Sequence, residues 1–423
     1  MTTSDARPAP RIDAGRLRAS LRQLGRVGSY LDPATGLEGV NRLSLTDADA
    51  EARRLVTGWM EAAGLTVRVD AIGNTFGHRP GRDPDAAPVL IGSHIDSVAT
   101  AGIFDGCLGV LGGLEVVRAL DEAGVATARP IEVAFFTEEE GVRFETDMLG
   151  SAVRAGRIAL TDALALTDRD GVTLGSELDR HGCRGPHPVD GPPPHAYVEC
   201  HIEQGPVLAR AGMDLGVVTG VQAISWQEVT IRGTPAHAGT TPMELRRDAG
   251  VAAARLTLHL HELAASGAVP GLRATVGRHD TSPNLANVVP QRVVATMDLR
   301  HPDDARLDRV EQDVERYLGH LAAELGVEIT TRRLVRTRAV AFDDHVREVI
   351  GSRVEEAGYR SIPILSGAGH DAQEMATLCP AGMIFVPGLH DGISHNPREE
   401  STPEACANGV DALLRTVLAL ADG

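Results

Sequence analysis

Apolar strands and amphipathic helices alternate along the first third of the chain. Apolar residues recur with helical spacing over residues 50–63 and 108–123, and nearly continuous apolar runs lie at 87–96 and 130–140. Strands that are apolar on both sides are typical of sheets covered by helices on both faces. This pattern predicts an α/β region built on a parallel or mixed sheet.

The pattern changes in the middle of the chain. Residues 225–233 and 292–300 alternate between apolar and polar positions, as half-exposed strands do, and two amphipathic helices are expected at 249–265 and 303–325. With a further strand after the second helix, the order is β-α-β-β-α-β. That order is typical of a small ferredoxin-like sheet with two helices on one face.

From about residue 339 the first pattern returns, with two more buried strands (SIPILSG and AGMIFVPG) and a long final helix. We therefore expect a discontinuous α/β domain, residues 1–216 and 336–423, with a mixed sheet and helices on both faces. An α+β domain, residues 217–335, is inserted into it.

The composition excludes several classes of protein. The 423 residues suffice for two domains, and 43% of them are hydrophobic, which supplies ample material for two cores. The balance of 41 basic and 58 acidic residues gives a net charge of −17, which argues against an extended nucleic-acid surface. No lysine occurs, so a Schiff-base lysine, a pyridoxal phosphate attachment and a phosphate-loop lysine are excluded.

The cysteines and the N-terminus bear on the cellular compartment. The five cysteines are scattered without a CxxC spacing, so neither a disulfide framework nor a cysteine zinc site is indicated. The first residues, MTTSDARPAPRID, lack the apolar core of a secretory signal, and no run approaches the ~18 apolar residues of a membrane helix. We expect a soluble, reduced, cytoplasmic protein with no membrane partner.

Histidines and acidic residues follow the ends of four expected strands. These residues are His94, Glu138, Glu139, Glu140, His201 and His395. Open α/β sheets present ligands at the carboxyl ends of their strands, so we expect these side chains to converge. Asp105 joins them, because it precedes the helix at 108–123 and the positive end of a helix dipole favours a carboxylate.

Imidazoles and carboxylates without thiolates are typical ligands of zinc, manganese or cobalt. Three histidines and two carboxylates are more than one tetrahedral ion needs, and a carboxylate bridging two ions ~3.5–4 Å apart would use them all. Asp96 lies two residues after His94, so along a strand the two side chains point the same way, and Asp96 is expected to orient the metal-bound imidazole. Taken alone, each of these residues would be assigned a structural role. Their joint placement at four strand ends indicates a metal site.

Eight ordered motifs carry a resemblance to a known family. They are GSHIDSV, GIFDGCLGVLGGLE, FTEEEGVRF, MLGSA, HIEQGPVL, GTPAHAGTTPM, SGAGHDAQEMA and ISHNPREES. The chain resembles the amidase/hydantoinase/carbamoylase family over residues 39–421. This family groups N-carbamoyl-L-amino acid hydrolases, dinuclear β-ureidopropionases and allantoate amidohydrolases with the aminoacylase and zinc carboxypeptidase superfamily.

The resemblance implies two divalent metal ions per subunit, zinc or else manganese or cobalt. His94 and His201 would hold one ion, Glu140 and His395 would hold the other, and Asp105 would bridge them.

Further roles follow from the same resemblance. Glu139 matches the general base, and His237 would reach the partner subunit's active site and stabilise the oxyanion. Arg300, Asn287 and Gln204 match positions that bind the substrate's carboxylate and its amide or ureido group. The inserted domain would be a lid and the interface of a homodimer.

The implied activity is hydrolysis of the C–N bond of an N-carbamoyl (ureido) L-amino acid, releasing the amino acid, ammonia and CO2. The alternative is an allantoate amidohydrolase, followed by an aminoacylase or dipeptidase. Ala152 and Val153 replace the Arg-Ala common in allantoate-type relatives, which favours the carbamoylase branch. A catalytically silent, metal-stabilised binding module would have lost Glu139 or a ligand, and all of them are present.

Overall fold

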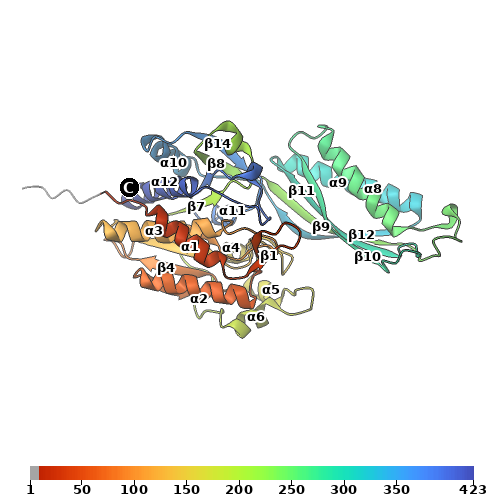
Figure 1. Ribbon diagram of the computed structural model, residues 1–423, viewed down its shortest axis with the longest axis horizontal. Helices are drawn as coiled ribbons and strands as arrows, with labels where there is room; N and C mark the ends of the chain where they lie inside the picture. The colour runs from red at the N-terminus through yellow and green to blue at the C-terminus, as the bar shows by residue number, and fades with distance from the viewer. Residues whose placement is uncertain (1–8) are drawn as a thin grey trace, which may run out of the picture. The chain divides into compact units, whose positions relative to one another are not determined.

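The computed structural model describes residues 9–423 and divides the chain into two compact units (Figure 1). The first unit consists of the residues up to Gly220 together with Ala341–Gly423, and the second is Val221–Val340. Residues 1–8, the first part of the stretch MTTSDARPAPRID in which no secretory signal was expected, lie outside the described residues. Within residues 9–423, every helix is too short or too polar to span a membrane.

A nine-stranded mixed sheet forms the centre of the first unit. Its strands are β3 (Thr66–Val69), β4 (Thr75–Arg79), β5 (Val89–His94), β6 (Ile131–Phe136), β7 (Ala196–Ile202), β8 (Leu215–Val221), β13 (Val340–Ala341), β14 (Ser361–Ser366) and β15 (Ala381–Val386). They run in the order β13-β8-β15-β7-β5-β6-β4-β3, and β14 pairs with β8. The central strands β15, β7, β5 and β6 are parallel, whereas β8 is antiparallel to β15, β4 to β6 and β3 to β4. A separate hairpin consists of β1 (Ser29–Leu31) and β2 (Glu38–Val40).

Helices cover both faces of this sheet. They are α1 (Ala14–Gly25), α2 (Asp47–Ala62), α3 (Cys107–Glu122), α4 (Leu149–Arg154), α5 (Leu160–Ala165), α6 (Leu174–His181), α7 (Val207–Ala211), α10 (Asp344–Glu356), α11 (Asp371–Met375) and α12 (Pro403–Asp422), with a 3₁₀ turn η2 (His390–Gly392). One core joins α1, α2, α3, α10 and α12 to the strand residues of one parity, such as Ile91, Val133 and Val198. Residues of the other parity face α4 and α11, because successive side chains of a strand point to opposite faces.

Helix α3 lies very close to the parallel strands. A Cβ atom on Gly109 would come 2.8 Å from the carbonyl oxygen of Cys200 and 2.9 Å from Cβ of Ser93. Only a hydrogen atom fits there, so this glycine lets α3 pack directly on β5 and β7. The packing fixes where α3 begins, and with it the position of Asp105.

The second unit has the element order β9–α8–β10–β11–α9–β12. Its elements are β9 (Ala223–Arg232), η1 (Met243–Leu245), α8 (Ala249–Ala265), β10 (Arg273–Ser282), β11 (Arg292–His301), α9 (Asp304–Leu325) and β12 (Glu328–Thr337). The four strands form an antiparallel sheet in the order β10-β11-β9-β12. Both helices share one hydrophobic core with the sheet. Asp248 and Asp303 begin the helices by accepting backbone N–H groups of the first turn.

The structure confirms a mixed α/β protein with a large mixed sheet and helices. The second unit, Val221–Val340, is displaced by a few residues from the predicted inserted range 217–335, because β8 continues the large sheet to Val221 and β13 pairs beside it. Helix α1 was not predicted, and the expected strand 130–140 ends earlier, at Phe136. The predicted order β-α-β-β-α-β required a strand at the place of β10 without giving its residues.

We predict that Gly109→Ala destabilises the protein by about 1–3 kcal/mol, because the added methyl group collides with backbone that cannot move freely. The matched control is Gly58→Ala, on the exposed side of α2, where a Cβ meets nothing within 4 Å. This control should instead stabilise the protein by up to about 1 kcal/mol, since alanine is the better helix former. Urea unfolding of both variants measures the difference, and equal effects would contradict the close packing of α3.

Candidate metal centre

The predicted ligands come from segments at the carboxyl ends of the parallel strands. His94 is the last residue of β5, Glu139 and Glu140 follow β6, and His201 lies one residue before the end of β7. Because β6, β5 and β7 are parallel neighbours, their ends lie side by side. His395 arrives from the loop after β15 and η2, where its backbone has a φ of 56°.

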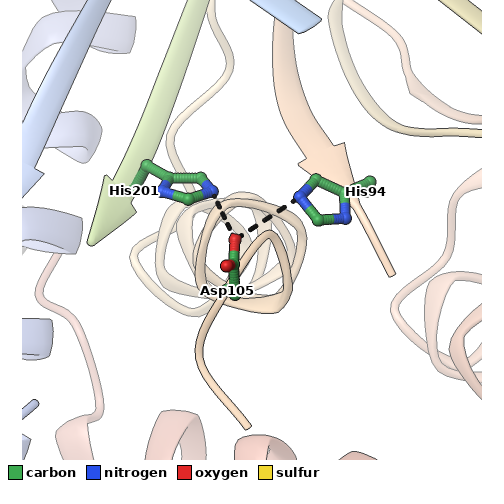
Figure 2. A group of neighbouring side chains, drawn as sticks. All are labelled: His94, Asp105 and His201. Atoms are coloured by element: carbon green, nitrogen blue, oxygen red, sulfur yellow. Dashed lines mark ion pairs between the residues drawn. The ribbon is translucent and has the colours of Figure 1, made fainter. Parts of the chain in front are cut away.

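The carboxylate of Asp105 lies at the centre of the group. Its Oδ1 is 3.2 Å from Nε2 of His201 and 3.6 Å from Nε2 of His94, as Figure 2 shows. Its Oδ2 is 3.4 Å from Nε2 of His395. Each oxygen therefore faces a different set of imidazoles, as expected of a carboxylate shared by two cations.

The side chains form two groups that could each hold a metal ion. One consists of His94, Asp105 and His201, and the other of Asp105, Glu140 and His395. In the second, Oε2 of Glu140 lies 3.3 Å from Nε2 of His395. In each group one ligand atom per residue lies within 4.8 Å of the others. The structure thus brings all five sequence-predicted ligands together.

Glu139 adjoins both groups without belonging to either. Its Oε2 lies 3.4 Å from Nε2 of His94, and its side chain is 8% exposed. A carboxylate beside bound ions that did not serve as their ligand would remain able to exchange a proton.

Backbone carbonyls orient the two buried imidazoles. Nδ1 of His94 lies 3.0 Å from the carbonyl oxygen of Asp96, and Nδ1 of His201 lies 2.9 Å from that of Ile202. When each Nδ1–H donates to its carbonyl, Nε2 keeps its lone pair and faces Asp105.

The predicted alignment of Asp96 along the strand needs correction. Strand β5 ends at His94, so the two residues do not share a strand, and Oδ1 of Asp96 lies 3.7 Å from Nδ1 of His94. The main-chain oxygen of Asp96 is the closer partner of the imidazole. Its carboxylate accepts the backbone N–H groups of Glu139 and Glu140, each at 3.4 Å.

Charges within the cluster are strongly coupled. Desolvation raises the pKa of Glu139 well above its ordinary value, and nearby carboxylates add to this while His94 opposes it. Glu140 raises the pKa of His395 to about 11 against the opposing effect of burial. For Asp105, desolvation is outweighed by hydrogen bonding to the three imidazoles, so its pKa falls well below its ordinary value. Such a site favours positive charge.

The donor set fits divalent cations. Nitrogen and carboxylate oxygen donors without thiolates suit zinc, manganese or cobalt. Oε1 of Glu140 is buried and has no hydrogen-bond partner among residues 9–423, although a carboxylate oxygen requires one or a cation. At Gly106, whose φ is 65°, a Cβ would lie 2.4 Å from Nε2 of His94, so glycine keeps the space in front of that nitrogen open.

A second carboxylate holds the segment that carries Asp105. Oε1 of Glu399 accepts the backbone N–H groups of Phe104 and Asp105, at 3.0 and 3.1 Å. Its Oε2 lies 2.7 Å from Oγ of Ser394, which also lies 2.9 Å from Oδ2 of Asp105. Sequence reasoning missed Glu399 and Ser394, although both fall within ISHNPREES, because a motif does not reveal which of its polar residues are buried.

Gln204 also contacts the central carboxylate. Its Nε2 donates to Oδ2 of Asp105 at 2.7 Å, and its backbone has a φ of 54°. The residue expected to bind substrate therefore lies against Asp105.

A buried polar layer supports His201. Glu199 accepts hydrogen bonds from Ser93 Oγ at 2.6 Å and from the Tyr197 hydroxyl at 3.0 Å. The ring of His370 packs edge-on against His201 with centroids 4.5 Å apart. Glu199, His201 and His370 form a third group with metal-ligand spacing, but hydrogen bonds already occupy both oxygens of Glu199. This layer, also missed from sequence, keeps the His201 imidazole in place.

The remaining predicted site residues lie in the second unit. His237 and Asn287 come from adjacent loops, where the backbone N–H of Ala238 donates to the carbonyl of Asn287 at 3.0 Å. Arg300 lies on β11, and its Nη2 is 2.8 Å from Oδ2 of Asp298. The structure therefore brings His237 and Asn287 together, and it fixes Arg300 against Asp298.

Comparisons with known proteins agree with this fold. Residues 90–419 match the model of peptidase family M20/M25/M40. The N-carbamoyl-L-amino-acid amidohydrolase of Rhizobium meliloti is 43% identical over 412 residues, 97% of each chain, and a ureidoglycolate hydrolase of Arabidopsis thaliana is 34% identical over 97% of this chain and 87% of its own. The crystal structure of a hydantoinase/carbamoylase family amidase from Burkholderia vietnamiensis superposes with a TM-score of 0.94 at 42% identity, covering both chains fully.

A mixed α/β fold with paired histidine and carboxylate groups at its strand ends defines a metal-dependent hydrolase. The chain belongs to peptidase family M20/M25/M40, among its hydantoinase/carbamoylase amidases.

We predict that chelation lowers the melting temperature and that zinc, manganese or cobalt restores it, because bound cations offset the repulsion among buried carboxylates. At a thousand times the dissociation constant, an ion stabilises the folded state by about 4 kcal/mol. Gly106→Ala should abolish this response, and Gly124→Ala is the control, since Gly124 has a φ of 62° but nothing within 4 Å of its Cβ position. Differential scanning fluorimetry with elemental analysis tests this, and a metal-free protein with unchanged stability would contradict it.

Proposed function

We propose that this protein hydrolyses N-carbamoyl-L-amino acids at the ureido C–N bond, releasing the amino acid, ammonia and CO2, with two divalent ions per subunit. The observation that carries the proposal is the shared carboxylate Asp105 between two ligand groups, with Glu139 beside them. The substrate class rests on the closer similarity to the carbamoyl-amino-acid amidohydrolase at 43% identity than to the ureidoglycolate hydrolase at 34%.

The reaction needs an activated water and a protonated leaving group. Divalent cations, when bound, acidify water and polarise a carbonyl oxygen. Glu139 is the residue that takes the proton from the attacking water and returns it to the leaving nitrogen. Its burial and its position 3.4 Å from His94 support this role, because a desolvated carboxylate binds a proton more readily than an exposed one.

His237 is the proposed donor to the tetrahedral oxyanion. Its Nδ1 accepts the backbone N–H groups of Gly239 and Thr240, at 3.0 and 3.2 Å. The neutral ring therefore carries its proton on Nε2, which leaves an N–H able to donate to an oxyanion. The side chain is exposed within its loop, as this role requires.

Arg300 and Asn287 are the proposed ligands of the substrate's carboxylate and ureido group. A guanidinium matches a carboxylate through two parallel hydrogen bonds. Asp298 accepts from Nε and Nη2 of Arg300 at 3.0 and 2.8 Å, so the guanidinium plane is oriented before substrate arrives.

The second unit is proposed to serve as the lid and as the interface of a homodimer. Helix α8 carries two apolar side chains that a monomer would leave in water, Val251 at 41% and Leu258 at 58% exposure. Burial of such residues favours association. In this arrangement His237 of one subunit would serve the active site of the other.

The alternative is an allantoate amidohydrolase, and an aminoacylase or dipeptidase comes next. All share the ligand set, so selectivity depends on the residues that bind the rest of the substrate.

A panel of N-carbamoyl-L-amino acids, 3-ureidopropionate, allantoate and N-acetyl amino acids tests the substrate class. We expect kcat/KM to be highest for an N-carbamoyl-L-amino acid, because Arg300 would fix its α-carboxylate. Glu139→Gln is the matched control, with metals retained and turnover reduced by roughly 10²–10⁴-fold. Faster hydrolysis of allantoate would shift the assignment to the alternative, and a fully active Glu139→Gln would remove Glu139 from the mechanism.

Mixing two inactive variants tests the shared site. Glu139→Gln and His237→Ala homodimers should each be nearly inactive, whereas their heterodimers contain one site with both residues intact. We expect activity to recover toward a quarter of the wild-type rate in an equal mixture. Lack of recovery, with subunit exchange demonstrated by mass spectrometry, would place His237 in the same subunit's site or outside it.

A further inference from the structure

A cavity of about 830 Å³ lies in the first unit. Its walls are formed by α1, by β2 and the residue before it, by residues 102–104 and by the segment 397–403. Of the described residues that line it, none is one of the five predicted ligands. The volume is within the range of roughly 300–1,000 Å³ that small-molecule sites occupy.

Four arginines line this cavity. Arg18, Arg22 and Arg26 are spaced four residues apart, so they lie on one side of α1 and its C-cap, and Arg398 faces them from the loop before α12. None of the four forms an ion pair with a carboxylate within residues 9–423. Elsewhere the chain pairs its arginines closely, for example Arg16 with Glu115 at 2.8 Å.

The acidic residues in the walls do not neutralise these arginines. Both oxygens of Glu399 are occupied by Ser394 and by the backbone of Phe104 and Asp105. Glu400 faces His390 at 3.4 Å. Glu38 alone among the described wall residues remains as an uncommitted carboxylate, opposite four guanidinium groups.

Surface position alone does not account for this group. Arg22 and Arg26 lie at the C-terminal end of α1, where the helix dipole favours cations by about 0.3–1 kcal/mol. The helix dipole does not explain the presence of Arg18 or Arg398. It also does not explain why all four arginines line one cavity. In a chain of net charge −17, a cavity with several unneutralised guanidinium groups attracts anions.

We propose that this cavity binds a small polyanion, an organic phosphate or a polycarboxylate, through the guanidinium groups of Arg22, Arg26 and Arg398. Guanidinium groups bind the oxygens of phosphate and carboxylate in pairs. The cavity is also lined by residues 102–104 and by Glu399, whose side chain accepts the backbone N–H of Asp105.

The test is isothermal titration of the full-length, metal-loaded protein at constant ionic strength. The probes are glucose 6-phosphate for the phosphate class, tricarballylate for the polycarboxylate class, and glucose as the uncharged control. We expect one of the two anions to bind with a dissociation constant below about 1 mM and glucose not to bind. The anion that binds identifies the chemical class of the ligand.

Two sets of variants locate the site. Arg22→Ala/Arg26→Ala and, independently, Arg398→Ala should each weaken binding at least tenfold, whereas Arg54→Ala, an exposed arginine of α2 outside the cavity, should leave it unchanged. All these side chains are exposed, so melting temperatures without probe should match the wild type. Failure of both anions to bind, or binding that survives in the double variant and in Arg398→Ala, would overturn the proposal.

Discussion

The arrangement of the candidate metal site depends on the position of one buried carboxylate, that of Asp105. The carboxylate of Asp105 lies within 3.6 Å of three imidazole nitrogens. The residue itself belongs to a loop between β5 and α3, outside the strands of the large sheet. Its backbone N–H is fixed by Glu399, and α3, which follows it, is held on the sheet by a glycine that admits no side chain. A carboxylate shared by two cations must keep each of its two oxygens at ligand distance from one of the two ligand groups. These restraints on the backbone fix the position of the Asp105 carboxylate.

The parallel part of the sheet also positions residues of the candidate metal site. Strands β6, β5 and β7 end side by side. His94 and His201 lie on β5 and β7, and Glu139 and Glu140 follow β6 after a left-handed backbone turn at Glu138. His395 arrives by a loop, and its left-handed backbone turns the imidazole toward Asp105. In the buried layer beside His201, the ring of His370 packs edge-on against the imidazole. Strands thus carry two of the five proposed ligands, His94 and His201, and loops supply Asp105, Glu140 and His395.

The sequence allowed much of this to be predicted, for physical reasons. Continuous apolar strands and amphipathic helices have clear periodicities, so the α/β organisation and the convergence of ligands at strand ends could be predicted. Contacts that depend on the exact path of a loop could not. Asp96 was expected to act through its carboxylate, but β5 ends before reaching it and its main-chain oxygen approaches His94 instead. Glu399 was overlooked because an acidic pair in a loop gives no sign of which member is buried. Helix α1 is rich in arginine, and its apolar positions Leu17, Leu21 and Leu24 are too few to give a strong signal.

The ligands differ greatly in their access to water. The side chains of His94 and His201 are 1% exposed, whereas that of His395 is 49% exposed. An ion between Glu140 and His395 would therefore exchange with solution far faster than one enclosed by His94 and His201. Mild dilution would then give a half-loaded protein rather than an empty one, and the outer position could hold a different element from the inner one.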